Sequence, residues 1–186
     1  MTMMIGGVLL FSAAHLLPSA MPLVRKQAIE KLGFNLYRGL FSLTIIASLV
    51  LIVFGWKAAT PASVYSAPLR GGPIVSALVF VAFVLFVASQ SKTNIRRYVR
   101  HPQMTAAALW AVAHLLVNGD SRSIVLFGGL GLWAVIEIVL CNRRDGAREK
   151  PAPVASLQDA VTLVIGAVGF ALIWYFHQAL FGVPTG

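Results

Sequence analysis

The stretch of sequence that decides the fold runs from Ser121 to Cys141 and reads SRSIVLFGGLGLWAVIEIVLC. After its first turn, Glu137 is the only charged residue in it. An α-helix rises about 1.5 Å per residue, so about 20 mainly apolar residues cross a hydrocarbon core of about 30 Å. The stretch therefore predicts a membrane-spanning helix.

The same pattern predicts five more apolar segments, and hence an all-α, polytopic bundle of about six transmembrane helices, a single domain over residues 1–186. The first, third and fourth segments are short and need a thin bilayer or little tilt. The first has no charge before its apolar run, so it is expected to be a retained helix and not a signal peptide. The segments are Met3–Leu17, Leu36–Trp56, Pro73–Gln90, Pro102–Asn118, Ser121–Cys141 and Ser156–His177.

The composition agrees with lipid as the solvent. Hydrophobic residues make up 58% of the chain and charged residues 11%, whereas soluble domains carry about 25% charged residues. The net charge of +9 is divided among several loops, which argues against a nucleic-acid-binding surface. With a single cysteine, Cys141, neither an intramolecular disulfide nor a cysteine-based zinc site can form.

The basic residues predict the orientation, because cytoplasmic loops are enriched in Lys and Arg. Of the 15 basic residues, 12 fall in the first, third and fifth loops with the adjoining helix ends. The remaining 3 are Lys57, Arg70 and Arg122. Both termini are therefore expected to face away from the cytoplasm.

Helix-end signals coincide with the segment boundaries. Pro102 suits the first turn of a helix, where its missing N–H has no consequence. Asp120 or Ser121 can cap the segment that follows. The pattern Ser156-x-x-Asp159 predicts a capping box at the start of the last segment.

Two histidines lie inside apolar segments, where ionisable groups are costly and are functional candidates. His15 and His114 each lie about 12 residues into a segment, which places them at depths that differ by about 6 Å. Imidazole is a common metal ligand and an axial ligand of haem iron. The alternative is a hydrogen bond to a neighbouring helix. His177, at the outer end of the last segment, is nearer in depth to His114 and is a substitute partner for it.

The neighbours of His114 on its own helix favour a cofactor. Ala107 and Ala111 share its face and predict a flat recess, and Trp110 is positioned to form a wall for a macrocycle. The alternative is that the small residues only allow close helix packing. Close packing is also the expected role of Gly128-Gly129-x-Gly131 and Gly166-x-x-Gly169.

A basic rim is predicted at the cytoplasmic side. His101 with Arg38, Arg97 and Arg100 forms a candidate anion site, since arginine binds carboxylates in a bidentate manner. Haem propionates or an anionic lipid would both qualify, and plain headgroup contact is the alternative for His101. Glu137 is expected to pair with a basic residue at the inner end of its helix, Arg143 or Arg144.

Several motifs together resemble the NnrU family over nearly the whole chain. They are His15 followed by Pro18, Tyr37-Arg38-Gly39-Leu40-Phe41-Ser42, Arg100-His101-Pro102-Gln103, Ala113-His114-x-x-x-Asn118-Gly119-Asp120, and His177 with Leu180-Phe181-Gly182-Val183. The resemblance implies a multi-pass protein of the bacterial inner (cytoplasmic) membrane, linked to denitrification and to nitric oxide and nitrite metabolism.

The family also includes the plant and cyanobacterial 15-cis-zeta-carotene isomerase, a membrane enzyme that contains haem b. In that enzyme, histidines that match His15 and His114 are assigned as iron ligands, so the resemblance implies haem b as the cofactor here. The isomerase has a cysteine three residues before the second histidine. This chain has Ala111 there, which argues against a redox ligand switch and puts isomerase activity in question.

Three functional hypotheses follow. The first is a haem b membrane protein that isomerises a hydrophobic polyene or senses a diatomic gas. The second is a non-enzymatic accessory or assembly protein for a respiratory nitric oxide or nitrite enzyme, with membrane lipid as the common partner. The third rests on Tyr98-Val99-Arg100-His101-Pro102, which resembles the cofactor-proximal motif of isoprenylcysteine carboxyl methyltransferases and implies S-adenosylmethionine. The paired-glutamate motif of those enzymes is missing here.

Overall fold

The computed structural model describes residues 1–183, and all of its regular structure is helical. A short π-helix, η1, interrupts the stretch between Ser121 and Asp145. In chain order the elements are α1 (Thr2–Ala20), α2 (Pro22–Leu32), α3 (Phe34–Ala58), α4 (Pro73–Gln90), α5 (Ile95–Tyr98), α6 (Pro102–Leu115), α7 (Ser121–Ser123), η1 (Ile124–Gly128), α8 (Gly129–Asp145) and α9 (Ser156–Phe181).

Within the described residues, five helices are long and apolar enough to cross a membrane: α1, α3, α4, the continuous α7–η1–α8 stretch and α9. This confirms a polytopic membrane bundle. The expected fourth segment is the exception. Its helix, α6, has 14 residues, which is about 21 Å of rise. The Asn118 side-chain amide and backbone N–H both donate to the His114 carbonyl at 2.9 Å and close the last turn early.

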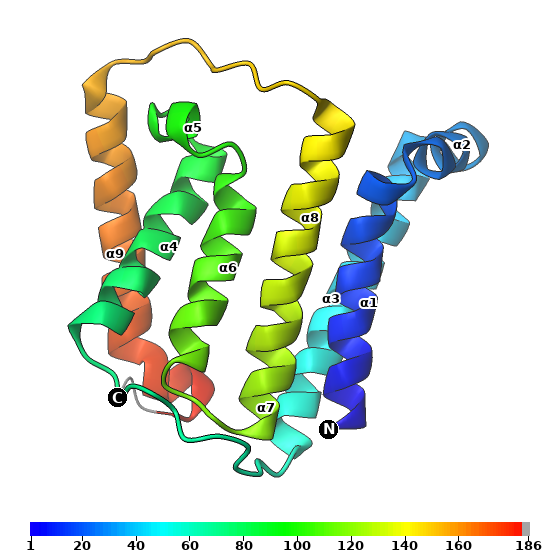
Figure 1. Cartoon of the computed structure of the whole chain (residues 1–186). Coiled ribbons are helices and arrows are strands. Elements are labelled where there is room, and N and C mark those ends of the chain that lie inside the picture. Colours follow the sequence, from blue (N-terminus) through cyan, green and yellow to red (C-terminus); the bar gives the residue numbers. More distant parts are fainter. Residues whose placement is uncertain (184–186) are drawn as a thin grey trace.

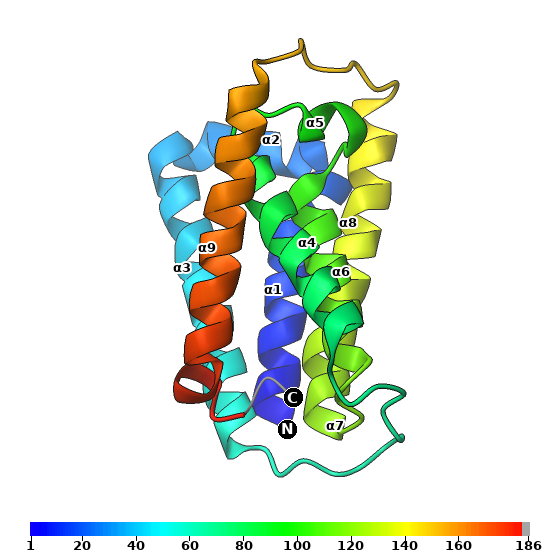
Figure 2. The ribbon, with the colours of Figure 1, turned by 90° about the vertical axis from the view of Figure 1, so that its left-hand side faces the viewer.

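The long helices and α6 form a curved row, as the two views in Figure 1 and Figure 2 show. The order in space is α3, α1, α8, α6, α4, α9, and each helix packs against the next. The order differs from the order in the chain, so α8 separates α1 from α6. Along the helix axes, the N-terminus and the end of α9 lie at one end of the bundle, and α2 and α5 lie at the opposite end (Figure 1).

Glycines set the closest helix contacts. A Cβ on Gly7 would lie 2.8 Å from the Ser48 carbonyl oxygen of α3, and a Cβ on Gly55 would overlap the Met4 backbone of α1. Gly166 of α9 lies against α4 in the same way. Because lipid gives apolar helices no hydrophobic reason to associate, close backbone contact through small residues holds them together. This confirms the expected role of Gly166 and adds Gly7 and Gly55.

Two of the three predicted helix-end signals are confirmed. Pro102 occupies the first turn of α6, and Asp120 caps α7. The capping box at the last helix is wrong: Ala155 is the N-cap of α9 and no side chain caps it. Asp159 instead accepts hydrogen bonds from the Asn94 backbone N–H at 2.7 Å and from its side-chain amide at 2.8 Å. The Asp159 carboxylate is therefore engaged in a tertiary contact with the α4–α5 turn and does not cap α9.

The loop between α3 and α4 is tied to the turn that follows α6. Gly119 carbonyl oxygen accepts from the backbone N–H groups of Val64 and Tyr65 at 2.9 and 3.1 Å. The Tyr65 hydroxyl donates to the Asn118 carbonyl at 2.9 Å. A Cβ on Gly119 would overlap the Tyr65 carbonyl, so glycine is needed for this approach. The Asn118-Gly119-Asp120 motif therefore joins two loops at one end of the bundle.

Candidate functional site

His114 lies on the last turn of α6 among aromatic side chains. Its Nδ1 donates to the Trp110 carbonyl oxygen at 2.8 Å. The imidazole stacks on the Phe127 ring with centroids 4.3 Å apart and an interplanar angle of 22°, and the Trp110 ring lies 5.0 Å away. Phe127 belongs to the π-helical turn η1, an irregularity that is often found at functional sites.

His15 has a similar setting on α1. Its Nδ1 donates to the Phe11 carbonyl oxygen at 2.9 Å. The rings of Phe11, Phe41 and Trp133 lie 4.2, 5.5 and 5.2 Å from the imidazole. Trp133 is buried, and its indole Nε1 has no hydrogen-bond partner among the described residues. A buried donor without an acceptor is rare. An acceptor atom on a bound group would satisfy the Trp133 N–H.

Both histidines bond a backbone carbonyl oxygen of their own helix through Nδ1. A carbonyl only accepts hydrogen bonds, so the bond fixes the proton on Nδ1 and leaves the Nε2 lone pair free. Within residues 1–183 neither Nε2 has a hydrogen-bond partner. Metal-ligating histidines use this arrangement, in which the second ring nitrogen donates to a carbonyl or a carboxylate. His15 and His114 therefore have the donor chemistry that a haem iron requires.

The structure does not bring His15 and His114 to one level. His15 contacts Trp133 and His114 contacts Phe127, and six residues of one helix separate those partners by about 9 Å. The helix that carries both partners also lies between α1 and α6. His177 lies near the end of α9. Its Nδ1 donates to the Val183 carbonyl oxygen at 2.8 Å, so its Nε2 is also available.

The recess expected beside His114 is not at Ala111. This residue is 1% exposed, and a Cβ on Gly131 of α8 would lie 2.9 Å from the Ala111 Cβ. Ala111 thus allows the close approach of α6 and α8. Close helix packing was the alternative interpretation of the small residues near His114. Trp110 does lie beside His114, as expected from the helical spacing. The contact confirms Gly131 as a packing glycine.

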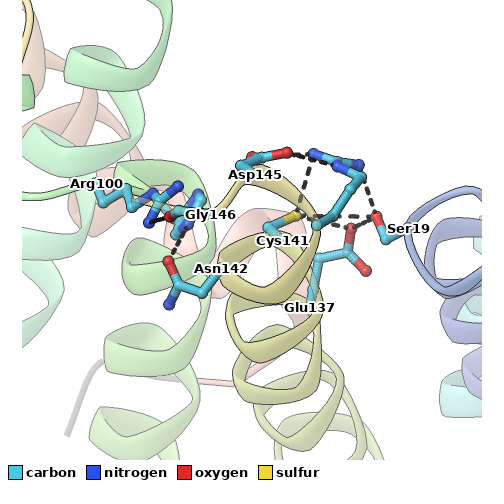
Figure 3. Close-up of polar contacts among 9 residues, drawn as sticks. Ser19, Arg100, Glu137, Cys141, Asn142, Asp145 and Gly146 are labelled. Carbon is cyan, nitrogen blue, oxygen red and sulfur yellow. Dashed lines mark hydrogen bonds and ion pairs between the residues drawn. The ribbon is translucent and has the colours of Figure 1, made fainter. Parts of the chain in front are cut away.

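The basic rim is only partly assembled. The Arg100 Nη1 donates to the Gly146 carbonyl at 2.9 Å, and His101 Nε2 lies 3.0 Å from the Asn142 Oδ1. Figure 3 shows Arg100 reaching Gly146 just beyond the end of α8. Arg38 is elsewhere: its guanidinium lies 5.9 Å from the Phe34 ring of its own helix. No contact among the described residues joins Arg38 to Arg100.

Glu137 does not pair with Arg143 or Arg144, contrary to expectation. It is 5% exposed and accepts hydrogen bonds from Ser19 of α1 and from the Cys141 thiol, the latter at 3.5 Å (Figure 3). Its second carboxylate oxygen has no partner within residues 1–183. The Arg144 guanidinium bonds Asp145 at 2.7 Å instead. Ser19 lies one helical turn beyond His15. Its hydrogen bond to Glu137 joins α1 to α8, and such a contact between helices cannot be read from sequence spacing.

The fold defines an α-helical, multi-pass membrane protein. The family profile described as "NnrU protein" matches residues 3–185. The chain belongs to the NnrU family. No curated protein and no solved structure gives a significant match.

Proposed function

We propose that this chain is a haem b-binding protein of the bacterial inner membrane, with His114 as an axial ligand. The observation that carries the proposal is the fixed Nδ1–H of His114, which leaves Nε2 free within an aromatic environment. Trp110 and Phe127 supply the apolar, flat surfaces that a macrocycle packs against. When bound, haem would supply an iron that takes diatomic gases or, with an open position, acts on a polyene.

The second axial position has two candidates. His177 is favoured by its place near the end of α9, at the same end of the bundle as the last turn of α6, which carries His114 (Figure 1). His15 is favoured by its matching hydrogen bond and by the unpartnered Trp133 Nε1 beside it, although it lies at a different level. If His114 were the single protein ligand, the iron would remain able to bind a gas or a substrate. The chain's own part is to hold the imidazole in one tautomer and to exclude water with aromatic rings.

The decisive measurement is the absorption spectrum of the protein purified in detergent after expression with haem supplied. We expect a Soret band in the wild-type protein and its loss in His114→Ala. A spectral change in His177→Ala and not in His15→Ala identifies His177 as the second ligand, and the reverse result identifies His15. Absence of the band from the wild-type protein would refute the proposal.

The reaction class is separated by two further assays on the haem-loaded protein. A shift of the Soret band on addition of nitric oxide supports gas binding. Chromatography of a cis-polyene after incubation, with His114→Ala as control, tests isomerisation. If the protein lacks haem and co-purifies with a respiratory nitrogen-oxide enzyme, the accessory function replaces both.

A further inference from the structure

A cavity of about 380 Å³, open to the surface, lies at the end of the bundle that carries α5, away from His15, His114 and His177. Its volume is in the range of about 300–1,000 Å³ that small-molecule sites occupy. Three arginines and two acidic residues account for its charged lining: Arg96, Arg100, Arg148, Asp145 and Glu149. No proposed function above uses this cavity, and Arg96, Arg148 and Glu149 were not among the candidate residues from the sequence.

Hydrogen bonds between two chain segments hold the cavity walls in place. The Arg148 Nη1 and Nη2 donate to the carbonyl oxygens of Tyr98 and Arg96 at 2.9 and 2.8 Å. In the opposite direction, Arg100 donates to the Gly146 carbonyl at 2.9 Å. The loop after α8 is thereby fixed to the α5–α6 segment. Because these bonds use only some of the five N–H donors of each guanidinium, the remaining donors are free to bind a ligand.

The charged side chains of the cavity that are not already paired include both basic and acidic groups. Asp145 is already paired, since Arg144 binds both of its carboxylate oxygens at 2.7 and 3.2 Å. Within residues 1–183, neither the Arg96 guanidinium nor the Glu149 carboxylate forms an ion pair. The cavity therefore offers arginine donors for a phosphate and one free carboxylate for a cation. Figure 3 shows Arg100 and Asp145 at the end of α8.

We propose that the cavity binds the phosphoethanolamine headgroup of a membrane lipid. Guanidinium groups bind phosphate through charge-assisted hydrogen bonds, and Arg96 with the free donors of Arg100 and Arg148 would hold it. Glu149 would take the ammonium group. The cavity begins where the membrane-length stretch Ser121–Asp145 ends, which is the level of lipid headgroups. Basic pockets at this level are known to bind lipid head groups.

The test is native mass spectrometry of the purified full chain, titrated with phosphatidylethanolamine, phosphatidylglycerol and phosphatidylcholine of identical acyl chains. We expect retention of phosphatidylethanolamine above the other two. Arg96→Gln should weaken binding of phosphatidylethanolamine and phosphatidylglycerol about tenfold, as loss of a hydrogen bond to a charged group does. Glu149→Gln should weaken only phosphatidylethanolamine. Arg100 and Arg148 are left intact because they fix the cavity walls.

The matched control is Arg143→Gln, which removes the same charge from an exposed position at the same end but outside the cavity lining. It should leave all three affinities unchanged. Equal retention of the three lipids, or an Arg96→Gln protein that binds as the wild type does, would overturn the proposal. So would competition by inorganic phosphate or free phosphoethanolamine at the concentration of the lipid, because the site would then serve a soluble ligand.

Discussion

At the scale of single residues, Asp120 shows how a cap stabilises the end of the bundle where His114 lies. Its Oδ1 accepts from the backbone N–H groups of Arg122 and Ser123 at 3.0 and 3.1 Å, and its Oδ2 accepts from the Ser123 hydroxyl at 2.6 Å. Partial burial works to raise the pKa of Asp120, but the bonds from Ser123 and Arg122, with the Arg122 charge, lower the pKa below its ordinary value. The folded state therefore favours the ionised carboxylate.

We expect Asp120→Ala to lower the free energy of unfolding by about 1 kcal/mol, the usual effect of losing an N-cap. The pH dependence has a definite sign. Because the folded pKa is depressed, the contribution is present above the unfolded pKa of about 4 and is lost as the pH falls through the folded pKa. Thermal unfolding in detergent between pH 3 and pH 7 measures both effects.

The control for this prediction is Glu30→Gln on the exposed helix α2, where the carboxylate forms only a long contact with Lys26. It should change the unfolding temperature little at any pH. An Asp120→Ala protein that keeps the acid sensitivity of the wild type would show that other carboxylates control it.

At the scale of elements, the α1–α3 contact depends on Gly55. The Met4 backbone occupies the place where a side chain would go, and a backbone cannot move aside as a flexible side chain does. We expect Gly55→Leu to destabilise the protein by at least about 1–3 kcal/mol, the usual effect of overpacking. Gly39→Leu on the same helix is the matched control, because nothing lies within 4 Å of a Cβ there. Equal melting temperatures for the two variants would contradict the contact.

The sequence predicted the elements well where hydropathy determines them and less well where tertiary contacts do. Long apolar runs locate α3 and α9 to within a few residues, since span length depends on the bilayer. The short polar helix α2 was expected to be a loop, because it has no long apolar run. The recess at Ala111 was wrong because the sequence did not show that Gly131 faces it.

For the candidate site too, the sequence predicted what hydropathy determines and missed what tertiary contacts determine. The sequence singled out His15 and His114 by their position inside apolar segments, and His177 as a substitute partner at the outer end of the last segment. Their Nδ1 bonds to backbone carbonyls were not predicted, nor was the placement of α8 between α1 and α6. Those features arise from the order in which helices pack, which differs from their order in the chain. For the same reason the Ser19–Glu137 bond, between residues 118 positions apart, had no sequence signal.

At the scale of the whole molecule, the basic segments α2, α5 and the loop after α8 gather at one end of the bundle, and the N-terminus and the end of α9 lie at the other (Figure 1). Cytoplasmic loops are enriched in basic residues, so we propose that this basic end is cytoplasmic and that α6 completes six crossings despite its 14 residues. The loop bonds at Gly119 support this: they hold the turn after α6 against the α3–α4 loop, at the end opposite α5.

Cysteine labelling with a membrane-impermeant reagent tests this arrangement in a Cys141→Ala background. Ser66→Cys, in the exposed α3–α4 loop, should react in cells whose outer membrane alone is permeabilised, and Ala152→Cys, in the exposed α8–α9 loop, only after the inner membrane is opened. If α6 does not cross, only α4 and α8 cross the membrane between the two positions, and both cysteines react from the same side. Reaction of Ala152→Cys alone in the first condition would instead invert the orientation, and the basic end would then face away from the cytoplasm.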